Sequence, residues 1–94
     1  MLDVRNAGDG RVALVGRLDA AESNHALSAL APFEGSLTVD CAQLDYISSA
    51  GLGVILQTYK RLKATGHEIR LVGLQPKVRN VFVYAGFDRL LGIE

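Results

Sequence analysis

A long amphipathic stretch between two short β-type segments constrains the fold of this chain more than any other feature. The segments 37–41 and 69–72 are short, apolar and partly β-branched, which is typical of strands. A strand, a helix and a second strand in this order predict a right-handed crossover between neighbouring parallel strands. The helical stretch runs from residue 49 to about 65, and its apolar side chains recur at the spacing of one helix face: Leu52, Ile55, Leu56, Tyr59 and Leu62.

A hairpin is predicted ahead of this unit. Residues 2–6 and 11–18 carry β-type apolar patterns. Gly8-Asp9-Gly10 lies between them and favours a tight turn, because glycine adopts positive φ without steric cost.

Two further helices complete the predicted fold. Asp19 or Ser23 caps a first helix that runs to about Leu30, and Pro76 begins a third helix. Residues 90–93 are predicted as a last edge strand. The order of elements predicts an α/β fold, with a mixed four- to five-stranded sheet and about three helices packed largely on one face.

The bulk composition restricts the function classes. With 94 residues, 49% of them hydrophobic, the chain suffices for one domain with one core, residues 1–94. Its 10 basic and 10 acidic residues give zero formal net charge, which argues against a nucleic-acid binder. The same neutrality leaves little repulsion between copies, so weak homodimerisation stays open. The short apolar runs and the lack of a signal-peptide pattern predict a cytoplasmic protein without membrane insertion.

One stretch, residues 45–56, carries specific chemistry because it places two hydroxyl groups, Ser48 and Ser49, at the start of the central helix. A serine before a helix is commonly an N-cap that stabilises the helix by about 0.5–2 kcal/mol. A phosphoserine at the same place carries a charge of about −1.5 to −2, which a helix N-terminus stabilises. The two interpretations are compatible, because one serine can cap while the other faces solvent.

Catalysis and cofactor binding are disfavoured by the residues available. Ile47 stands where a nucleophile elbow has glycine, and the only histidines, His25 and His67, lie in polar contexts. Gly51-Leu52-Gly53 lacks the third glycine of a dinucleotide fingerprint, and no Walker lysine follows it. The single cysteine, Cys41, supports neither a disulfide framework nor a metal site. We therefore predict a binding protein that is not an enzyme, with no cofactor and no metal.

The stretch 45–56 resembles the signature of STAS domains, in which Asp-Ser-Ser-Gly-Leu-Gly leads into the second helix. Gly16-Arg17-Leu18-Asp19 resembles the family's Gly-Glu-Leu-Asp, and Val39-Asp40 resembles the family's strand ending in aspartate. Residues 75–82, followed by 85–87, resemble the family's third helix, which starts with proline and stops at glycine. The resemblance covers nearly the whole chain and is to the anti-sigma factor antagonist type, which implies the STAS fold.

The resemblance assigns individual residues when the Gly-Leu-Gly motifs are aligned. The family's phosphorylated serine falls on Ser49, with Ser48 as the alternative acceptor. The aspartate that normally precedes it is replaced by Ser48, and the serine that normally follows it is replaced by Ala50. The missing aspartate removes a charge that a kinase or a phosphatase metal site would use.

What the resemblance implies is a partner switch. The unmodified protein binds an anti-sigma factor that is also an ATP-dependent serine kinase, and the sigma factor is released. Phosphorylation of Ser49 separates the complex, and a metal-dependent serine phosphatase resets it. The implied partner-binding residues are Asp19, Ala20, Ala21, Asp45, Tyr46, Ile47, Ser48, Ser49, Ala50, Gly51 and Gly53. The alternative is a phosphorylation-independent STAS adaptor, a subunit of a transporter or of a signalling assembly.

Overall fold

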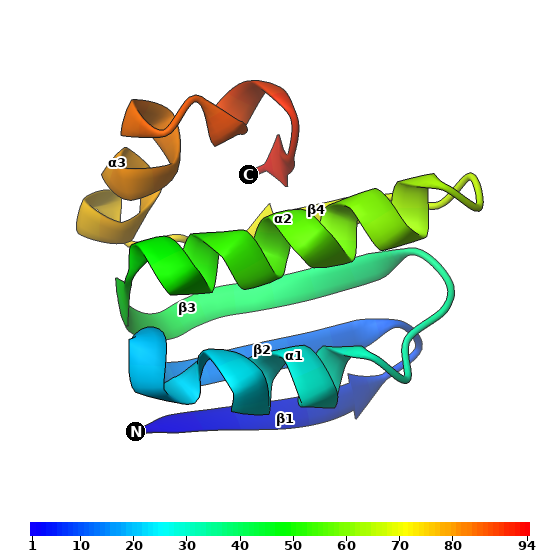
Figure 1. Ribbon diagram of the computed structural model, residues 1–94, viewed down its shortest axis with the longest axis horizontal. Helices are drawn as coiled ribbons and strands as arrows, with labels where there is room; N and C mark the ends of the chain where they lie inside the picture. The colour runs from blue at the N-terminus through cyan, green and yellow to red at the C-terminus, as the bar shows by residue number, and fades with distance from the viewer.

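The computed structural model describes the whole chain, Met1 to Glu94, as one five-stranded sheet with helices packed against it (Figure 1). The strands are β1 (Leu2–Gly8), β2 (Arg11–Leu18), β3 (Leu37–Ile47), β4 (Ile69–Val72) and β5 (Gly92–Ile93). The helices are α1 (Ser23–Leu30), α2 (Ser49–Lys63) and α3 (Pro76–Tyr84), with short 3₁₀ turns η1 (Ala20–Glu22) and η2 (Phe87–Arg89). The predicted α/β fold is confirmed.

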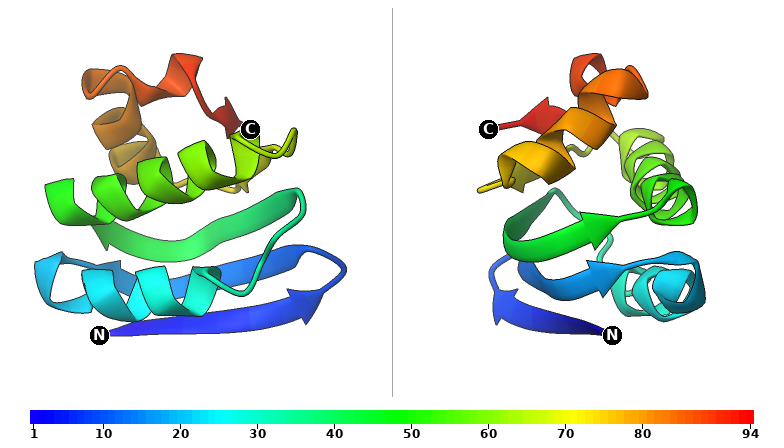
Figure 2. Two further views of the ribbon diagram at one scale, coloured as in Figure 1. Left: turned by 45° about the vertical axis from the view of Figure 1, so that its right-hand side comes forward. Right: turned by 90° about the vertical axis from the view of Figure 1, so that its left-hand side faces the viewer.

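The sheet is mixed, and its strands follow one another in chain order. β1 pairs antiparallel with β2 through the predicted hairpin, whereas β2, β3, β4 and β5 run parallel. Each parallel connection carries a helix, and α1 and α2 lie side by side over the same face of the sheet (Figure 2). Because the parallel strands share one direction, the starts of the three helices gather near one edge of the sheet.

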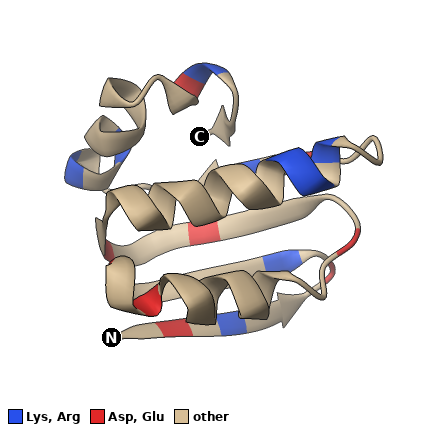
Figure 3. Ribbon diagram, viewed as in Figure 1, with Lys and Arg blue, Asp and Glu red and all other residues tan.

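The core lies between that face and the helices. A cluster of 20 buried residues forms it, including Val12, Leu14 and Leu18 of β2 and Ile55 and Leu62 of α2. No charged residue is buried, and three basic residues lie in the last turn of α2, far from its start (Figure 3). Burial of apolar surface at roughly 25 cal/mol per Å² therefore dominates the stability of the fold.

β3 is longer than the sequence pattern predicts. The prediction covered residues 37–41, whereas the strand continues to Ile47. Two register shifts against β2 interrupt the alternation of buried and exposed side chains, one near Ala42 and one near Asp45. A bulge resets the period of two that sequence analysis relies on, so the second half of the strand was not recognised.

The ends of the helices differ from the predictions by a few residues. α2 ends at Lys63, and Gly66 with φ +80° completes the turn that follows. Its last turn is tied to the end of α1, because the Arg61 guanidinium donates to the carbonyl oxygens of Phe33 at 2.7 Å and Leu30 at 3.0 Å. The last strand is shorter than the predicted 90–93, because Leu90 still belongs to the end of η2.

Candidate functional site

The carboxyl ends of β2 and β3 bring two predicted segments together. Leu18 and Ile47, at the ends of these strands, are register partners. The N–H of Ser48 donates to the carbonyl oxygen of Leu18 at 2.9 Å, which fixes the start of α2 beside the loop that follows β2. The two groups of predicted partner-binding residues, Asp19–Ala21 and residues 45–53, therefore form one continuous end of the molecule.

The two serines have different roles in the first turn of α2. Ser48 is the N-cap, with extended backbone angles of φ −91° and ψ 173°, and its Oγ accepts from the N–H of Gly51 at 3.1 Å. Ser49 is the first residue of the helix, and its side chain is exposed. One hydroxyl group is thus used by the fold, and the other is free to be modified or covered.

The two glycines of this turn also differ. Gly51 is buried, and a Cβ there would lie 2.7 Å from the carbonyl oxygen of Leu18 and 2.9 Å from Cγ1 of Ile47. Gly53 is exposed, and a Cβ there would meet nothing within 4 Å. Gly51 therefore permits close packing of α2 on the sheet, whereas Gly53 leaves the outer surface of the turn flat.

The start of α2 favours an anion electrostatically. The first turn contains no acidic residue, so the partial positive charge of the helix N-terminus is not neutralised within the helix. The first N–H groups of a helix have no partner inside it. The start of α2 is therefore a favourable place for an anionic group.

The loop after β2 provides the second part of the site. Asp19 caps η1, because its Oδ1 accepts from the N–H of Glu22 at 3.1 Å. Ala20 and Ala21 are exposed and present only methyl groups. Glu22 holds the loop against the first strand, since its Oε1 accepts from the N–H of Leu2 at 2.9 Å. This loop is therefore short, capped at its start by Asp19 and tied to β1 by Glu22, and it presents only small side chains between them.

The end of β3 provides the third part. Tyr46 is 41% exposed, and the Arg17 guanidinium lies over its ring, 4.3 Å from the ring centroid. Asp45 is exposed, whereas Ile47 is buried beneath the first turn of α2. Ile47 and Gly51 therefore contribute to this surface by packing rather than by presenting atoms to solvent.

Comparison with known proteins identifies the family. The model of the family described as "Mlab, STAS domain" matches residues 2–92. The chain belongs to the STAS domain family.

Individual relatives of this STAS domain include anti-sigma factor antagonists, as the sequence analysis expected. A protein of Bordetella bronchiseptica with the name "Putative anti-sigma factor antagonist BtrV" is 46% identical over 54 residues, which are 57% of this chain. The matched segment spans 47% of the length of that relative.

Two solved structures share the fold. SpoIIAA of Bacillus in its phosphorylated form superposes with a TM-score of 0.72 at 17% identity, covering 100% of this chain and 91% of SpoIIAA. A sulfate transporter family protein of Wolinella succinogenes superposes with a TM-score of 0.77 at 15% identity, covering 96% of this chain and 76% of that one. At these identities the likeness shows the fold alone.

Two further residues of this STAS domain lie at the site and were missed in the sequence. β4 pairs with β3 only as far as Asp40, and α3 starts beside the part of β3 that continues. Gln75 at that start donates through Nε2 to the carbonyl oxygen of Ala42 at 3.2 Å and to Oδ1 of Asp45 at 3.3 Å. Lys77 lies two residues further along the chain and is exposed. The sequence did offer one indication of these two residues. The predicted parallel strands place the start of the third helix at the same end of the sheet as the start of α2.

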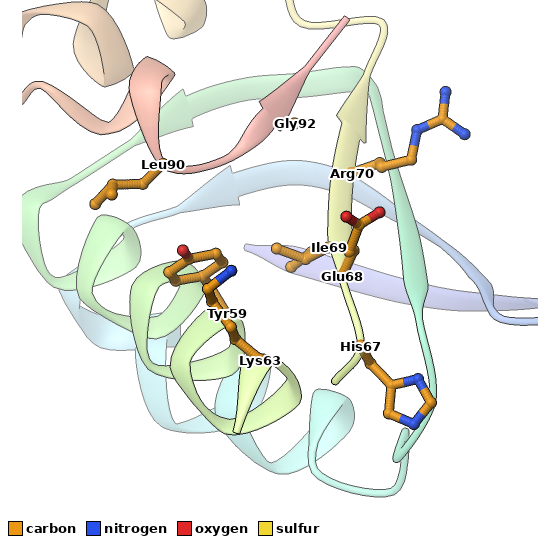
Figure 4. Close-up of a pocket in the computed structure, with 8 residues that line it drawn as sticks. All are labelled: Tyr59, Lys63, His67, Glu68, Ile69, Arg70, Leu90 and Gly92. Atoms are coloured by element: carbon orange, nitrogen blue, oxygen red, sulfur yellow. The ribbon is translucent and has the colours of Figure 1, made fainter. Parts of the chain in front are cut away.

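The remaining chemistry of this STAS domain lies away from the site. Burial, reinforced by the nearby Asp40 carboxylate, raises the pKa of the Cys41 thiol to about 12, so the thiol stays protonated at neutral pH and is a poor nucleophile. A groove of ≈ 130 Å³ lies between the end of α2 and β4, and Tyr59, His67 and Arg70 are among the residues that line it (Figure 4). No group of three or more potential metal ligands is found, and no helix has the length and apolarity to cross a membrane.

Proposed function

We propose that residues 1–94 form a single STAS domain that acts as an anti-sigma factor antagonist by switching partners. The unphosphorylated form binds a serine-kinase anti-sigma factor and frees the sigma factor. The kinase then phosphorylates Ser49, which abolishes binding, and a metal-dependent serine phosphatase restores the first state. The chain works by binding and not by catalysis.

The exposed hydroxyl of Ser49 beside the capping hydroxyl of Ser48 carries this proposal. Because Ser48 already satisfies the N–H of Gly51, modification of Ser49 leaves the helix cap intact. The phosphoryl group adds charge and bulk to the outer surface of the turn while the fold persists. Its effect therefore falls on a partner docked over this end.

Two relatives support the proposal. BtrV, whose printed name is "Putative anti-sigma factor antagonist BtrV", is 46% identical to this chain over 54 residues. SpoIIAA has been solved both as the unphosphorylated anti-sigma factor antagonist and in the phosphorylated form. A switch based on phosphorylation is thus compatible with this fold.

The modification is tested by intact-mass spectrometry after incubation with ATP and the kinase-like anti-sigma factors encoded in the same genome. We expect a single phosphate that maps to Ser49, is absent from Ser49→Ala and is retained in Ser48→Ala. Phosphate on Ser48 instead would move the switch to the capping residue. A stable complex without any phosphate would contradict the phosphorylation cycle.

The consequence for binding is tested with Ser49→Asp. This variant should fold normally and bind the anti-sigma factor about 10- to 100-fold more weakly, or about 1.5–3 kcal/mol, because the carboxylate has to be desolvated in the interface. Ser28→Asp, an exposed serine on α1, is the matched control and should bind as the unmodified chain does. Equal affinity of Ser49→Asp and Ser49→Ala would reject Ser49 as the switch.

A phosphorylation-independent adaptor is the second candidate. It is favoured by the fold shared with the sulfate transporter family protein, and by Ser48 in place of the acidic residue that the STAS signature has there. In that case the same end of the molecule would dock constitutively onto a transporter or signalling subunit. Copurification of such a subunit with both Ser49→Asp and the unmodified chain would favour the adaptor.

A further inference from the structure

A small hollow lies between the end of β3 and the start of α3. It measures ≈ 90 Å³ and is lined by Asp45, Tyr46, Ile47, Lys77, Val78 and Val81. It exists because β3 continues to Ile47 whereas β4 stops at Val72, so that α3 rather than a strand packs against this part of β3. We call it the β3–α3 hollow.

The floor of the β3–α3 hollow is apolar and fixed. Ile47 is 3% exposed and Val78 1% exposed, and both belong to the core. Val81 is half-buried and Tyr46 is 41% exposed, so these two side chains form its walls. A preformed apolar hollow of this kind binds a side chain without ordering new structure, which lowers the entropic cost of binding.

The charges at the mouth of the hollow are unequal. The Asp45 carboxylate already accepts from the Gln75 amide at 3.3 Å, and the Arg17 guanidinium stacks on the Tyr46 ring. Lys77 takes part in none of the three salt bridges of the molecule, which join Met1 to Glu22, Arg5 to Asp3 and Arg70 to Glu94. Neither contact neutralises a charge, so the Asp45 carboxylate and the Arg17 and Lys77 cations together leave one net positive charge at the mouth, which favours an acidic residue of a partner.

The hollow is continuous with the site around Ser49. Ile47, which forms its floor, directly precedes the cap Ser48 and packs beneath the first turn of α2. The end of β3 lies between the starts of α2 and α3 (Figure 2). A protein that covers about 800 Å² of this end, the usual share of one partner, reaches both sides of β3.

We propose that the β3–α3 hollow receives an apolar side chain of the anti-sigma factor, next to an acidic residue of that partner that pairs with Lys77. This inference rests on the proposed function and adds α3 to the docking surface. The volume is smaller than the roughly 150 Å³ of an apolar cavity that holds benzene, so the side chain is leucine- or valine-sized rather than aromatic. An anchor in a fixed pocket with a neighbouring Tyr and Arg has the composition of a binding hot spot.

The experiment is isothermal titration of the anti-sigma factor that binds the unmodified chain into two variants. Lys77→Glu should weaken binding about tenfold at low ionic strength and less at high salt, because exposed charges are screened. Val81→Thr keeps the shape of the wall but places a hydroxyl group in the hollow, and should weaken binding about tenfold at any salt concentration.

Two matched control variants carry the same kinds of substitution outside the hollow, and they show whether a loss of binding is specific to the hollow. Lys60→Glu reverses a charge in the last turn of α2, and Val83→Thr changes a valine of α3 that is 38% exposed and does not line the hollow. Both should bind within about twofold of the unmodified chain, since surface changes outside an interface have small effects. Circular dichroism of all four variants verifies that each is folded.

The outcomes distinguish this inference from the proposed function. If Lys77→Glu and Val81→Thr bind as well as their controls while Ser49→Asp binds about 10- to 100-fold more weakly than the unmodified chain, the hollow is not part of the interface and the switch stands. If Ser49→Asp binds as well as the unmodified chain while both hollow variants fail, the docking surface stands without the switch. If no anti-sigma factor binds the unmodified chain, both proposals are overturned.

Discussion

The inner and outer sides of the start of α2 differ although they lie within six consecutive residues, Ser48 to Gly53. On the inner side, Ser48 caps the helix and Gly51 packs against Leu18 at a distance that leaves no room for a Cβ. On the outer side, Ser49 and Gly53 are exposed, and nothing lies within 4 Å of a Cβ at Gly53. The same two residue types thus serve the fold on one side and leave a flat, modifiable surface on the other.

This difference between the two sides separates the residue that caps α2 from the residue that is proposed to be modified. Modification of a capping serine would remove the cap and lower the stability of the helix by about 0.5–2 kcal/mol in each cycle. Here the capping hydrogen bond belongs to Ser48, so a change of the Ser49 side chain leaves that bond intact. Four substitutions test this separation.

Gly51→Ala should have the largest effect on stability and lower the free energy of unfolding by about 1–3 kcal/mol. The new methyl group would lie 2.7 Å from the Leu18 carbonyl oxygen, which belongs to the backbone of β2 and cannot easily move. Urea denaturation followed by circular dichroism measures the change. An unfolding midpoint unchanged by the substitution would show that α2 does not need this close approach.

Ser48→Ala should come next, with a loss of about 1 kcal/mol, because the N–H of Gly51 loses its acceptor. The same denaturation experiment measures the loss, and Ser48→Asp should recover most of it, since aspartate is an equally good N-cap. If Ser48→Ala were as stable as the unmodified chain, the cap assignment would be wrong.

Gly53→Ala should change stability in the opposite direction, raising the free energy of unfolding by about 0.5–1 kcal/mol. Alanine restricts the unfolded chain and favours the helix, and the space around this position is open. The contrast in sign between Gly51→Ala and Gly53→Ala is the sharpest test of the comparison. Destabilisation by both substitutions would remove the distinction between the two sides.

Ser49→Ala should have the smallest effect on stability, within about 0.5 kcal/mol, because an exposed side chain without a structural hydrogen bond is replaced. The thermal midpoint of this variant, measured beside that of Ser48→Ala, checks the prediction. A loss comparable to that of Ser48→Ala would mean that both hydroxyl groups support the helix, and that phosphorylation cannot leave the fold unchanged.

The sequence by itself determined the order and type of the elements, because hydrophobic periodicity, turn glycines and helix caps are local properties. It also placed two serines, Ser48 and Ser49, at the start of α2, so that either could be the N-cap. Which of them caps was decided only in three dimensions, where the N–H of Ser48 is held by the Leu18 carbonyl oxygen of the neighbouring strand.

The tertiary structure alone decided the length of β3 and what lies beside its end. Two bulges hide the second half of that strand from a periodicity analysis, because each resets the alternation of side chains. The same extension places Gln75 against Ala42 and Asp45, residues 30 or more positions away. Contacts at such separations depend on strand register and relative strand length, which no local pattern in the sequence encodes.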